Sequence, residues 1–319
     1  MAEKLGKKVP AALAYARCIR DYPLTYYGYL ASKRLSAIDK QSAAEATNAA
    51  LRVRSSQGIL ESSAVRLADP KLKRAVTLLR MGLQSFARSE FARLGLQNRG
   101  DPADAWLMSL LYKEVGEHRR SYRMARKRQI DTLHDPPTGA HRARWELAYP
   151  RPSIYAPTVN AAAKQHKIAP ALVWSIMRHE SAFRSSVVSF ANAVGLMQLI
   201  IPTGAAMARR EGVTGSINRK RLQDPELNIK LGTRFLGRLS KRFEGHPALI
   251  AAGYNAGPGR PIKWLQRKDS EELDLFVERI PYRETRRYTK SVVTSYLRYR
   301  YLYEEAAPPS VAIRLPRVE

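Results

Sequence analysis

Cysteine, acidic residues and long apolar runs are scarce in this 319-residue sequence. Its single cysteine, Cys18, excludes an intrachain disulfide and leaves the redox compartment open. No apolar run approaches the roughly 20 residues that a membrane-spanning helix requires, so we expect no such helix. Arg17 and Arg20 interrupt the stretch after the basic N-terminus, so the sequence shows no apolar core of a signal peptide. The six histidines lack metal-ligand spacings such as H-E-x-x-H, and we expect neither a metal site nor a cofactor.

Acidic side chains are outnumbered: 28 Asp and Glu stand against 55 Lys and Arg, which gives a formal net charge of +27 and a pI near 10.4. A protein this basic is expected to meet polyanions, which include nucleic acids, acidic lipid surfaces and anionic bacterial wall polymers. The excess of positive charge is distributed evenly along the chain. Residues 1–150 carry 27 basic and 14 acidic side chains, and residues 151–319 carry 28 and 14. A dedicated nucleic-acid-binding arm would concentrate its basic residues, so the even spread weakens that interpretation without removing it.

Helical periodicity dominates the sequence, and the alternation typical of strands is scarce. Short turn signals such as Asp69-Pro70 and Gly116 separate the helical stretches of the first half. We therefore predict an all-α fold whose N-terminal region consists of helical hairpins stacked in series. Helices are predicted over residues 11–19, 71–83, 84–94, 103–115, 121–128, 153–166, 170–179, 202–210, 225–243, 247–255, 262–266, 273–279 and 284–305.

Proline-rich segments mark a predicted domain boundary. Residues 135–139 (Asp-Pro-Pro-Thr-Gly) and 149–152 (Tyr-Pro-Arg-Pro) lie between two helical stretches. We therefore expect a helical domain over residues 1–148, a second helical domain over residues 149–305 and a loose C-terminal tail over residues 306–319.

One carboxylate, Glu180, falls on the apolar side of a predicted helix. It follows Val173, Ile176 and Met177 at spacings of seven, four and three residues. A carboxyl group there is partly desolvated, which raises its pKa toward the value that a general acid needs near neutral pH. Glu180 also stands four residues before Arg184, and the pattern alone favours an ordinary solvated ion pair between these two residues.

Two later stretches do not have the pattern of core helices. Residues 195–199 read Gly-Leu-Met-Gln-Leu, and residues 251–260 read Ala-Ala-Gly-Tyr-Asn-Ala-Gly-Pro-Gly-Arg. Glycines beside an aromatic and an amide side chain favour a loop where the backbone approaches a ligand and polar groups point at it. A helix end followed by a turn explains the glycines and the proline, but it leaves Tyr254 and Asn255 without a role.

Four motifs occur in the order that is typical of one family. They are residues 180–183 (Glu-Ser-Ala-Phe), residues 195–199 with Thr203 downstream, residues 252–260, and residues 280–288 (Ile-Pro-Tyr-Arg-Glu-Thr-Arg-Arg-Tyr). With these motifs the sequence resembles the lytic transglycosylases of the soluble, goose-lysozyme-like type, which act on bacterial peptidoglycan. The resemblance covers roughly residues 153–303 and implies a lysozyme-like α-helical catalytic domain. A weaker similarity at residues 22–28 implies that the upstream hairpins form a curved superhelix and linker.

The resemblance implies a single catalytic acid, Glu180. By that resemblance it protonates the glycosidic oxygen of the β-1,4 bond between N-acetylmuramic acid and N-acetylglucosamine. Its carboxylate then takes a proton from the muramic C6 hydroxyl, and a 1,6-anhydro end forms. The only acids between positions 151 and 223 are Glu180 and Glu211, which fits a reaction whose second nucleophile comes from the substrate. The resemblance also implies substrate-binding roles for Ser181, Met197, Gln198, Tyr254, Asn255 and Glu284.

Three residues in or beside these motifs have two interpretations each. Ser181 contacts substrate or hydrogen-bonds its own helix. Glu284 lies near an end of the cleft, or it caps its helix together with Thr285. His179 stands where the family more often has an acidic or small polar residue, and it is either a partner of the acid or a surface histidine.

The main expectation is a peptidoglycan lytic transglycosylase of cell-wall turnover whose partners are glycan strands and not nucleic acid. There are two alternatives: a lysozyme-type hydrolase of the same bond, and a basic non-catalytic module that binds wall polymer or nucleic acid. The positive charge predicts peripheral association with an anionic wall or membrane surface that weakens with salt. Because peptidoglycan lies outside the cytoplasmic membrane, we expect a periplasmic or cell-envelope location, with this chain being a fragment of a longer exported precursor.

Overall fold

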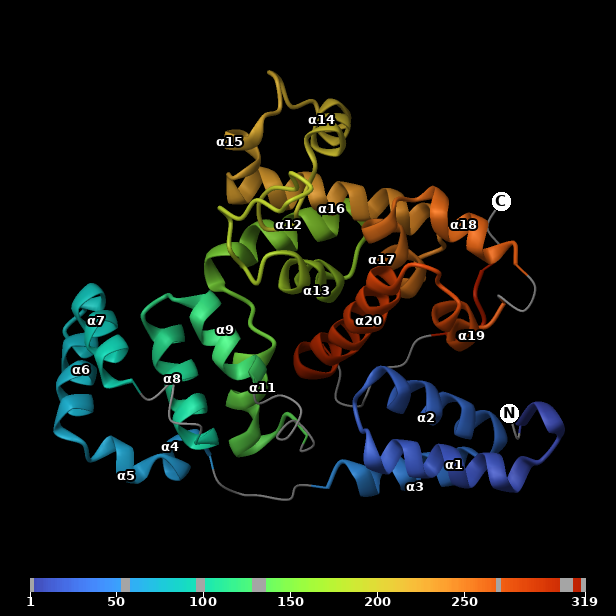
Figure 1. Ribbon diagram of the computed structural model, residues 1–319, viewed down its shortest axis with the longest axis horizontal. Coiled ribbons are helices and arrows are strands. Elements are labelled where there is room, and N and C mark those ends of the chain that lie inside the picture. The colour runs from blue at the N-terminus through green and yellow to red at the C-terminus, as the bar shows by residue number, and fades with distance from the viewer. Residues whose placement is uncertain are drawn as a thin grey trace. The chain divides into compact units, whose positions relative to one another are not determined.

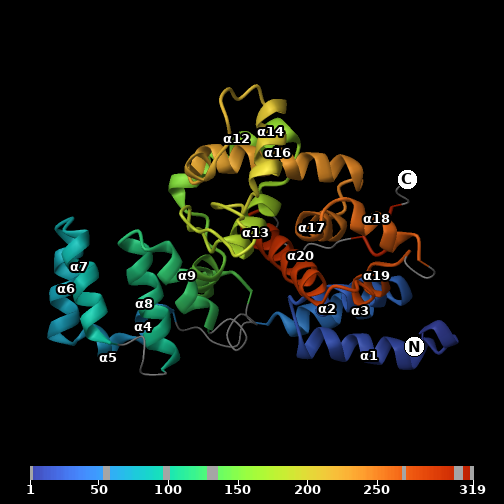
Figure 2. The same cartoon turned by 45° about the horizontal axis from the view of Figure 1, so that its top comes forward.

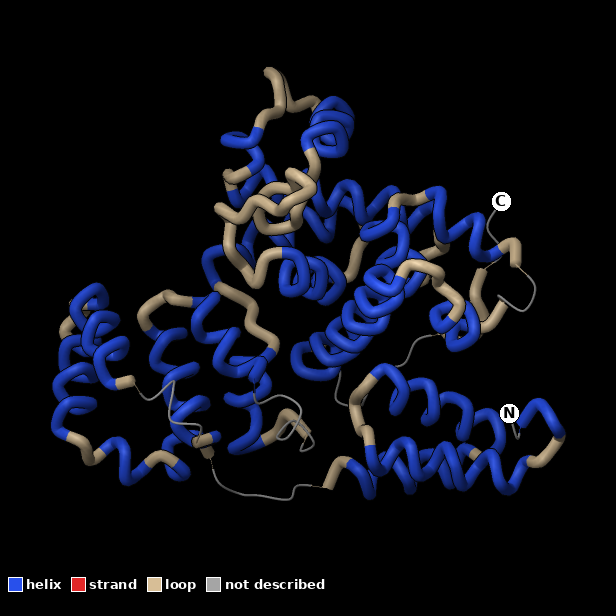
Figure 3. Tube along the Cα trace, viewed as in Figure 1, coloured by secondary structure: helices blue, strands red, loops and turns tan. Residues whose placement is uncertain are grey.

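The computed structural model describes residues 3–52, 58–95, 101–127, 136–267, 271–304 and 312–316. Within these ranges the regular secondary structure is helical, apart from three isolated β-bridges (Figure 3). The predicted all-α fold class is confirmed. None of the helices in these ranges has both the length and the apolar character that crossing a membrane demands.

The chain forms two compact units, and the first is discontinuous in sequence. It joins Met1–Ala50 to Ser153–Glu319, whereas Leu51–Pro152 form the second unit. The junction at Pro152 lies close to the division that we expect near residue 148. The N-terminal helices, however, belong to the same unit as the C-terminal part of the chain. A functional domain boundary near residue 148 stays a prediction.

The unit Leu51–Pro152 is built from helical hairpins (Figure 1). Helix α6 (Pro70–Arg80) packs against α7 (Gln84–Leu94), and α8 (Pro102–Glu114) packs against α9 (His118–Lys127). Three shorter helices in the described part of this unit are α4 (Ile59–Ser62), α5 (Ala64–Leu67) and α11 (Arg142–Ala148).

Aspartates start two of these helices, and an apolar cluster holds the hairpins together. The side chains of Asp69 and Asp101 each accept a hydrogen bond from a backbone N–H of the first turn, and a proline occupies that turn. Leu72, Phe91 and Leu107 are fully buried in the shared core. The periodic apolar residues that predicted these helices are therefore the ones that join them.

Five helices form the core of the other unit (Figure 2). The long helix α20 (Arg283–Tyr303) packs against both α13 (Pro170–Glu180) and α17 (Pro247–Ala256). Helix α12 (Ala156–His166) packs against α16 (Pro225–Arg242). A proline lies in the first turn of α12, α13, α16 and α17, where its missing N–H costs no helical hydrogen bond.

Shorter helices complete this core. Helices α14 (Ile201–Arg210) and α15 (Arg219–Leu222) pack against α16, α18 (Gly259–Leu265) follows α17, and α19 (Leu273–Glu278) precedes α20. A buried cluster that includes Met207, Leu222 and Leu231 joins α14 and α15 to α16. The loop between α13 and α14 lies next to this cluster, because its Val194 and Leu199 belong to it.

Three N-terminal helices belong to the same unit: α1 (Lys8–Asp21), α2 (Tyr26–Ile38) and α3 (Lys40–Ala50). Their own core contains Ile19 and Leu35 together with alanines of α2 and α3. Thr25 caps α2, since its hydroxyl oxygen accepts a hydrogen bond from the backbone N–H of Gly28 at 3.1 Å.

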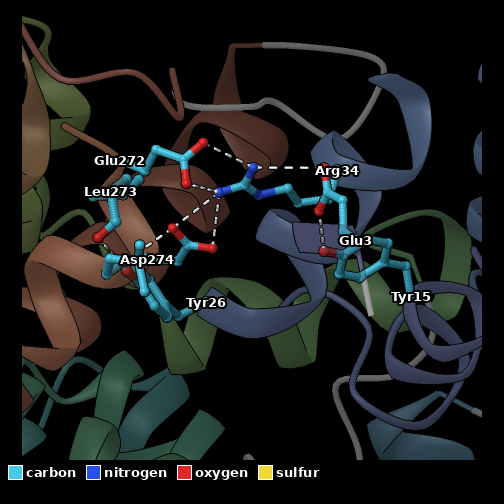
Figure 4. Close-up of polar contacts among 8 residues, drawn as sticks. Glu3, Tyr15, Tyr26, Arg34, Glu272, Leu273 and Asp274 are labelled. Carbon is cyan, nitrogen blue, oxygen red and sulfur yellow. Dashed lines mark hydrogen bonds and ion pairs between the residues drawn. The ribbon is translucent and has the colours of Figure 1, made fainter. Parts of the chain in front are cut away.

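Arg34 on α2 links these helices to α19. Its guanidinium lies 2.9 Å from the Glu272 carboxylate and 3.0 Å from the Asp274 carboxylate (Figure 4), and its side chain is 14% exposed. A second link joins α20 to the N-terminal part, because the Arg298 guanidinium donates a hydrogen bond to the backbone carbonyl of Leu24 at 2.7 Å. The N-terminal helices therefore support both α19 and α20.

Part of the C-terminal tail is held against this unit. The Leu273 N–H donates to the Ile313 carbonyl at 2.7 Å, and the Leu315 N–H donates to the Glu271 carbonyl at 2.8 Å. The Leu315 side chain is buried. The expectation of a loose tail is therefore wrong for residues 312–316, because these backbone hydrogen bonds and the burial of Leu315 fix the segment. Residues 305–311 and 317–319 lie outside the described part of the chain.

Candidate active site

Glu180 is the last residue of α13, a helix whose preceding turns are enclosed by the core. Every side chain of α13 at positions 171–178 is buried, so the helix holds its last residue in a fixed place. The Glu180 carboxylate is partly buried and lines a cavity. The predicted alternative, an ion pair with Arg184, is absent among the described residues. Glu180 therefore has the environment expected of a general acid and not that of a surface ion pair.

The pKa of Glu180 is raised to about 7, chiefly by burial, because a charged carboxylate loses hydration there. The negative charge of Glu284 raises this pKa further. The Tyr288 hydroxyl opposes both effects, since it donates a hydrogen bond to Glu180 Oε1 at 2.5 Å and favours the charged form. A carboxyl group with a pKa near 7 can exchange a proton in both directions at neutral pH.

Two partly buried tyrosines stand next to this carboxylate. The pKa of Tyr288 and the pKa of Tyr254 both lie well above 10, because burial and the Glu180 charge disfavour phenolate. Both phenols therefore remain hydrogen-bond donors. Tyr254 donates to the backbone carbonyl of Met197 at 2.7 Å, and its ring lies 5.2 Å from that of Phe235 on α16.

The turn at residues 195–199 is fixed by a buried amide, Asn228 of α16. Its Oδ1 accepts a hydrogen bond from the Met197 N–H at 2.7 Å, and its Nδ2 donates to the carbonyls of Val194 and Leu222 at 2.9 and 2.8 Å. Gly195 has φ +83°, and a Cβ atom there would lie 2.4 Å from the Asn228 amide. Only glycine fits both the conformation and the space.

Met197 and Ser181 hold this turn from inside. The Met197 side chain is fully buried and packs on Gly232 of α16, where a Cβ would lie 2.3 Å from the sulfur. The Ser181 hydroxyl donates to the carbonyl of Leu196 at 2.8 Å, and its oxygen also lies 3.2 Å from the carbonyl oxygen of Met177. Neither side chain lines the cavity beside Glu180. In the structure Met197 packs in the core and Ser181 hydrogen-bonds the backbone, and the substrate-binding roles of both stay predictions.

The cavity itself has a volume of about 980 Å³ and brings together the remaining predicted residues. Its wall includes side chains from the loop after α13, from α14, α16 and the end of α17, and from the first turn of α20. Phe190 and Phe235 add aromatic surface, and Arg238 of α16 adds a positive charge. The predicted residues that line it are Glu180, Gln198, Tyr254, Asn255 and Glu284.

Two amide side chains of the cavity wall use only part of their hydrogen-bonding capacity within the described structure. Gln198 Nε2 donates to the carbonyls of Gly195 and Val187 at 2.9 and 3.2 Å, and among the described residues its Oε1 has no partner. Asn255 Oδ1 accepts a hydrogen bond from the Thr285 hydroxyl at 2.5 Å. Gln198 can therefore accept from a ligand while Asn255 can donate to one.

The contacts of α20 also bear on the two interpretations of Glu284 and of His179. No side-chain hydrogen bond caps the first turn of α20, and the Thr285 hydroxyl is used by Asn255 instead. Glu284 thus lines the cavity from the first turn of α20, where a negative charge also favours the helix dipole. His179 is partly buried: its Nε2 lies 2.8 Å from Ser295 Oγ, and its ring lies 6.2 Å from that of Tyr288. It is not a free surface histidine, and no hydrogen bond joins it to Glu180 in the described structure.

Residues 157–277 match the family model of the transglycosylase SLT domain. The chain is 37% identical over 166 residues to the putative soluble lytic murein transglycosylase of Haemophilus influenzae, a match that covers 51% of this chain and 28% of that protein. It is 36% identical over 136 residues to the soluble lytic murein transglycosylase of Escherichia coli, with 42% and 21% covered. The chain therefore aligns with less than a third of the length of these relatives.

Two solved structures are similar over almost the whole chain. An inactive mutant of the lytic transglycosylase Slt from Pseudomonas aeruginosa superposes with a TM-score of 0.65 at 25% identity and covers 91% of this chain and 42% of that one. The 70 kDa soluble lytic transglycosylase of Escherichia coli superposes with a TM-score of 0.71 at 22% identity, covering 98% and 47%, and this likeness shows the fold. Residues 157–277 therefore carry a transglycosylase SLT domain, and through this domain the chain is similar to the lytic transglycosylases.

Proposed function

We propose that this protein is a peptidoglycan lytic transglycosylase, with Glu180 as its single catalytic acid and base. The observation that carries the proposal is the Glu180 carboxylate itself: it lines the cavity, its pKa is about 7, and Tyr288 holds it by a hydrogen bond. The substrate is the β-1,4 bond between N-acetylmuramic acid and N-acetylglucosamine, and the products carry 1,6-anhydromuramic acid ends.

Glu180 acts first as an acid. With a pKa of about 7 a large fraction is protonated at neutral pH, and the proton passes to the glycosidic oxygen as the bond to the anomeric carbon breaks. The positive charge that develops on the sugar is stabilised by its own acetamido group. Asn255, whose Oδ1 is held by Thr285, has its amide N–H groups free to orient that acetamido group from the cavity wall.

Glu180 then acts as a base. Loss of its proton leaves a carboxylate that the Tyr288 hydroxyl stabilises, and this carboxylate takes the proton of the muramic C6 hydroxyl. The C6 oxygen bonds to the anomeric carbon, so the ring closes without water and Glu180 regains its proton. Gln198 and the aromatic surface of Tyr254 and Phe235 orient the sugars on either side.

A lysozyme-type hydrolase of the same bond is the second candidate, and Glu284 favours it. A hydrolase usually places two carboxylates about the scissile bond, and Glu284 lines the same cavity as Glu180. Glu284, however, is exposed at the first turn of α20. The shortage of other acids in the cavity wall supports the reaction that uses a substrate hydroxyl. A purely non-catalytic binding module has no need of a buried, titrating Glu180.

Digestion of purified sacculi followed by mass spectrometry of the released muropeptides tests the proposal. We expect 1,6-anhydro ends, which are lighter than reducing ends by one water. Reducing ends from the unmodified protein would favour the hydrolase. Absence of any release, together with salt-resistant binding to duplex DNA, would favour the binding module.

The same function places the protein in the cell envelope, where its substrate lies. The net charge of +27 supports peripheral association with an anionic wall or membrane surface. Sedimentation with sacculi should weaken between low and high salt, because the Debye length falls from roughly 30 Å at 0.01 M to 3 Å at 1 M. Binding that does not change with salt would contradict this part of the proposal.

A further inference from the structure

Three large apolar side chains are exposed where α6 joins α7, in the unit Leu51–Pro152. Met81 directly follows α6 and is 66% exposed, Leu83 directly precedes α7 and is 38% exposed, and Phe86 in the first turn of α7 is 62% exposed. None of the three belongs to the buried cluster that joins the hairpins in the described structure. We call residues 81–86 the hairpin tip. Its apolar side chains contribute nothing to the core of the hairpin.

Hydrogen bonds hold the backbone of the hairpin tip in one conformation. The N–H groups of Met81, Gly82 and Leu83 each donate at 3.0 Å to a carbonyl in the last turn of α6. Gly82 has φ +75°, and a Cβ atom there would meet nothing within 4 Å. The apolar side chains are therefore presented on a preformed turn that faces open space.

Basic side chains accompany the hairpin tip, and acidic ones do not. Residues 70–89 contain five Lys or Arg residues and no Asp or Glu. Lys73 stands two helical turns before Arg80 and Met81 on the same face of α6, and Lys73 and Arg80 are exposed without a side-chain partner among the described residues. The next acid along the chain, Glu90, is paired with two arginines at 3.5 and 3.2 Å. The hairpin thus combines exposed apolar surface with unpaired positive charge.

This combination fits one class of partner. Wall polymers and nucleic acids are hydrated polyanions, which attract the positive charges but offer no apolar phase to Met81 and Phe86. A second copy of the chain would bring two groups of like charge together, which repel each other. An anionic phospholipid surface satisfies both features, because its phosphates attract Lys and Arg while apolar side chains enter the boundary between headgroups and acyl chains.

We propose that the hairpin tip binds the surface of an anionic phospholipid membrane. Met81, Leu83 and Phe86 enter the boundary between headgroups and acyl chains, and Lys73 and Arg80 contact lipid phosphates. The inference goes beyond the proposed reaction, since no residue of the unit Leu51–Pro152 lines the cavity beside Glu180. It also narrows the peripheral association of the proposed function from any anionic surface to a lipid one.

The first test is co-sedimentation with vesicles of phosphatidylglycerol, which is anionic, mixed with phosphatidylcholine. The variant Met81→Gln with Phe86→Gln removes apolar surface from the hairpin tip and leaves every charge of the protein in place. The matched control is Val9→Gln with Leu13→Gln on α1, where the two side chains are 72% and 68% exposed in the other unit. All four positions are exposed, so both variants should keep the fold.

We expect the tip variant to bind these vesicles about tenfold more weakly than the unmodified protein, and the control to stay within about twofold. Equal binding by the tip variant would mean that the net charge alone attracts the vesicles, and it would overturn the inference. An equal loss in the control would overturn it as well, because the loss would then not be specific to the hairpin tip.

A second pair of variants tests the role of charge. Lys73→Gln with Arg80→Gln should weaken binding by about tenfold. The control, Lys220→Gln with Arg242→Gln, removes the same charge at two exposed side chains without a partner among the described residues, and a loss of no more than about twofold is expected. Vesicles of phosphatidylcholine alone should bind the unmodified protein more weakly than the anionic vesicles do. Equal losses in the two double variants would refute a specific contact of the hairpin with lipid phosphates.

A fluorescent reporter tests whether the hairpin tip enters the lipid. The four tryptophans of the protein are buried, so Phe86→Trp adds a single exposed one. With anionic vesicles whose acyl chains are brominated, the fluorescence of Phe86→Trp should be quenched and shifted to the blue, whereas that of the control Leu13→Trp should not change. Absence of quenching at vesicle concentrations that sediment the protein would overturn the inference.

Failure of this inference can be told apart from failure of the proposed function. Vesicle binding needs no catalysis, so all of these measurements can be repeated in the Glu180→Gln protein. Tip-dependent vesicle binding without any anhydro product would leave this inference standing and reject the proposed function. Anhydro products without tip-dependent vesicle binding would reject this inference alone.

Discussion

Tyr288 of α20 donates a hydrogen bond to the carboxylate of Glu180 at the end of α13. The contact joins residues that are 108 positions apart in the chain, at the place where these two core helices pack together. It stabilises the charged form of a carboxyl group whose burial favours the neutral form. The balance leaves the pKa of Glu180 at about 7, so the same residue can give and take a proton.

The first prediction concerns the pH dependence of activity. Because the proposed reaction begins with protonated Glu180, kcat/KM should fall as pH rises through about 7. In Tyr288→Phe the carboxylate loses its hydrogen bond, so the pKa of Glu180 rises and the alkaline limb should move to higher pH at a lower overall rate. A pH profile of both proteins checks this. A limb that moves to lower pH in Tyr288→Phe would contradict the assigned role.

The second prediction concerns stability. The folded-state pKa of Glu180 is raised from 4.5 to about 7, so the folded protein binds this proton more tightly than the unfolded chain does. Stability is therefore lost as pH rises from about 4.5 to about 7. Glu180→Gln removes that loss and should be more stable than the unmodified protein by about 1–3 kcal/mol at pH 8, with a much smaller difference at pH 4. Urea unfolding at both pH values measures it; a variant that is less stable at pH 8 would refute the buried-carboxyl account.

The third prediction concerns Arg34, which links α2 to α19. In Arg34→Met the carboxylates of Glu272 and Asp274 lose their partner, and we expect a loss of about 1–3 kcal/mol. The N-terminal helices should then be cut more readily in limited proteolysis. The control is Arg17→Met, because the Arg17 side chain is 77% exposed beside Asp21 and a solvated pair of this kind contributes little to stability. Equal effects of the two changes would show that Arg34 does not hold α2 to α19.

The fourth prediction concerns the turn that carries Gln198. Gly195→Ala forces a left-handed conformation on alanine and places its Cβ against Asn228, so we expect a loss of about 2–4 kcal/mol and reduced activity. Gly212→Ala is the matched control, because Gly212 also has a positive φ but open space around the added atom, and about 1 kcal/mol is expected. Thermal unfolding of both variants gives the comparison. Similar losses would mean that the close approach of Asn228 does not fix the turn.

The sequence pointed to Glu180 and to the polar side chains that line the same cavity, and their catalytic and substrate-binding roles stay predictions. The apolar positions of α13 placed Glu180 on a buried face, and the glycine-rich motif pointed to Tyr254 and Asn255. Their mutual geometry was not predictable, because it depends on how α13, α17 and α20 pack. For this reason no role was predicted for Tyr288. It belongs to the motif at residues 280–288 and stands one turn after Glu284 on the same helix.

Residues that hold the turn at residues 195–199 in place were harder to predict from the sequence than residues that line the cavity. Asn228 was not singled out, since an amide within a helical pattern gives no sign of the distant turn that it bonds. The family resemblance assigned Met197 to the sugar groove, whereas the tight turn directs its side chain to Gly232. Helix α3 was missed because it is rich in alanine and has few large apolar side chains to show a period.

The central claim is that a substrate hydroxyl, and not water, attacks the anomeric carbon after Glu180 has given its proton. Cleavage of sacculi in water enriched in heavy oxygen, followed by mass spectrometry, tests this most directly. The account predicts 1,6-anhydro ends without heavy oxygen from the unmodified protein, and no release from Glu180→Gln. Reducing ends that carry heavy oxygen, or normal release by Glu180→Gln, would contradict it.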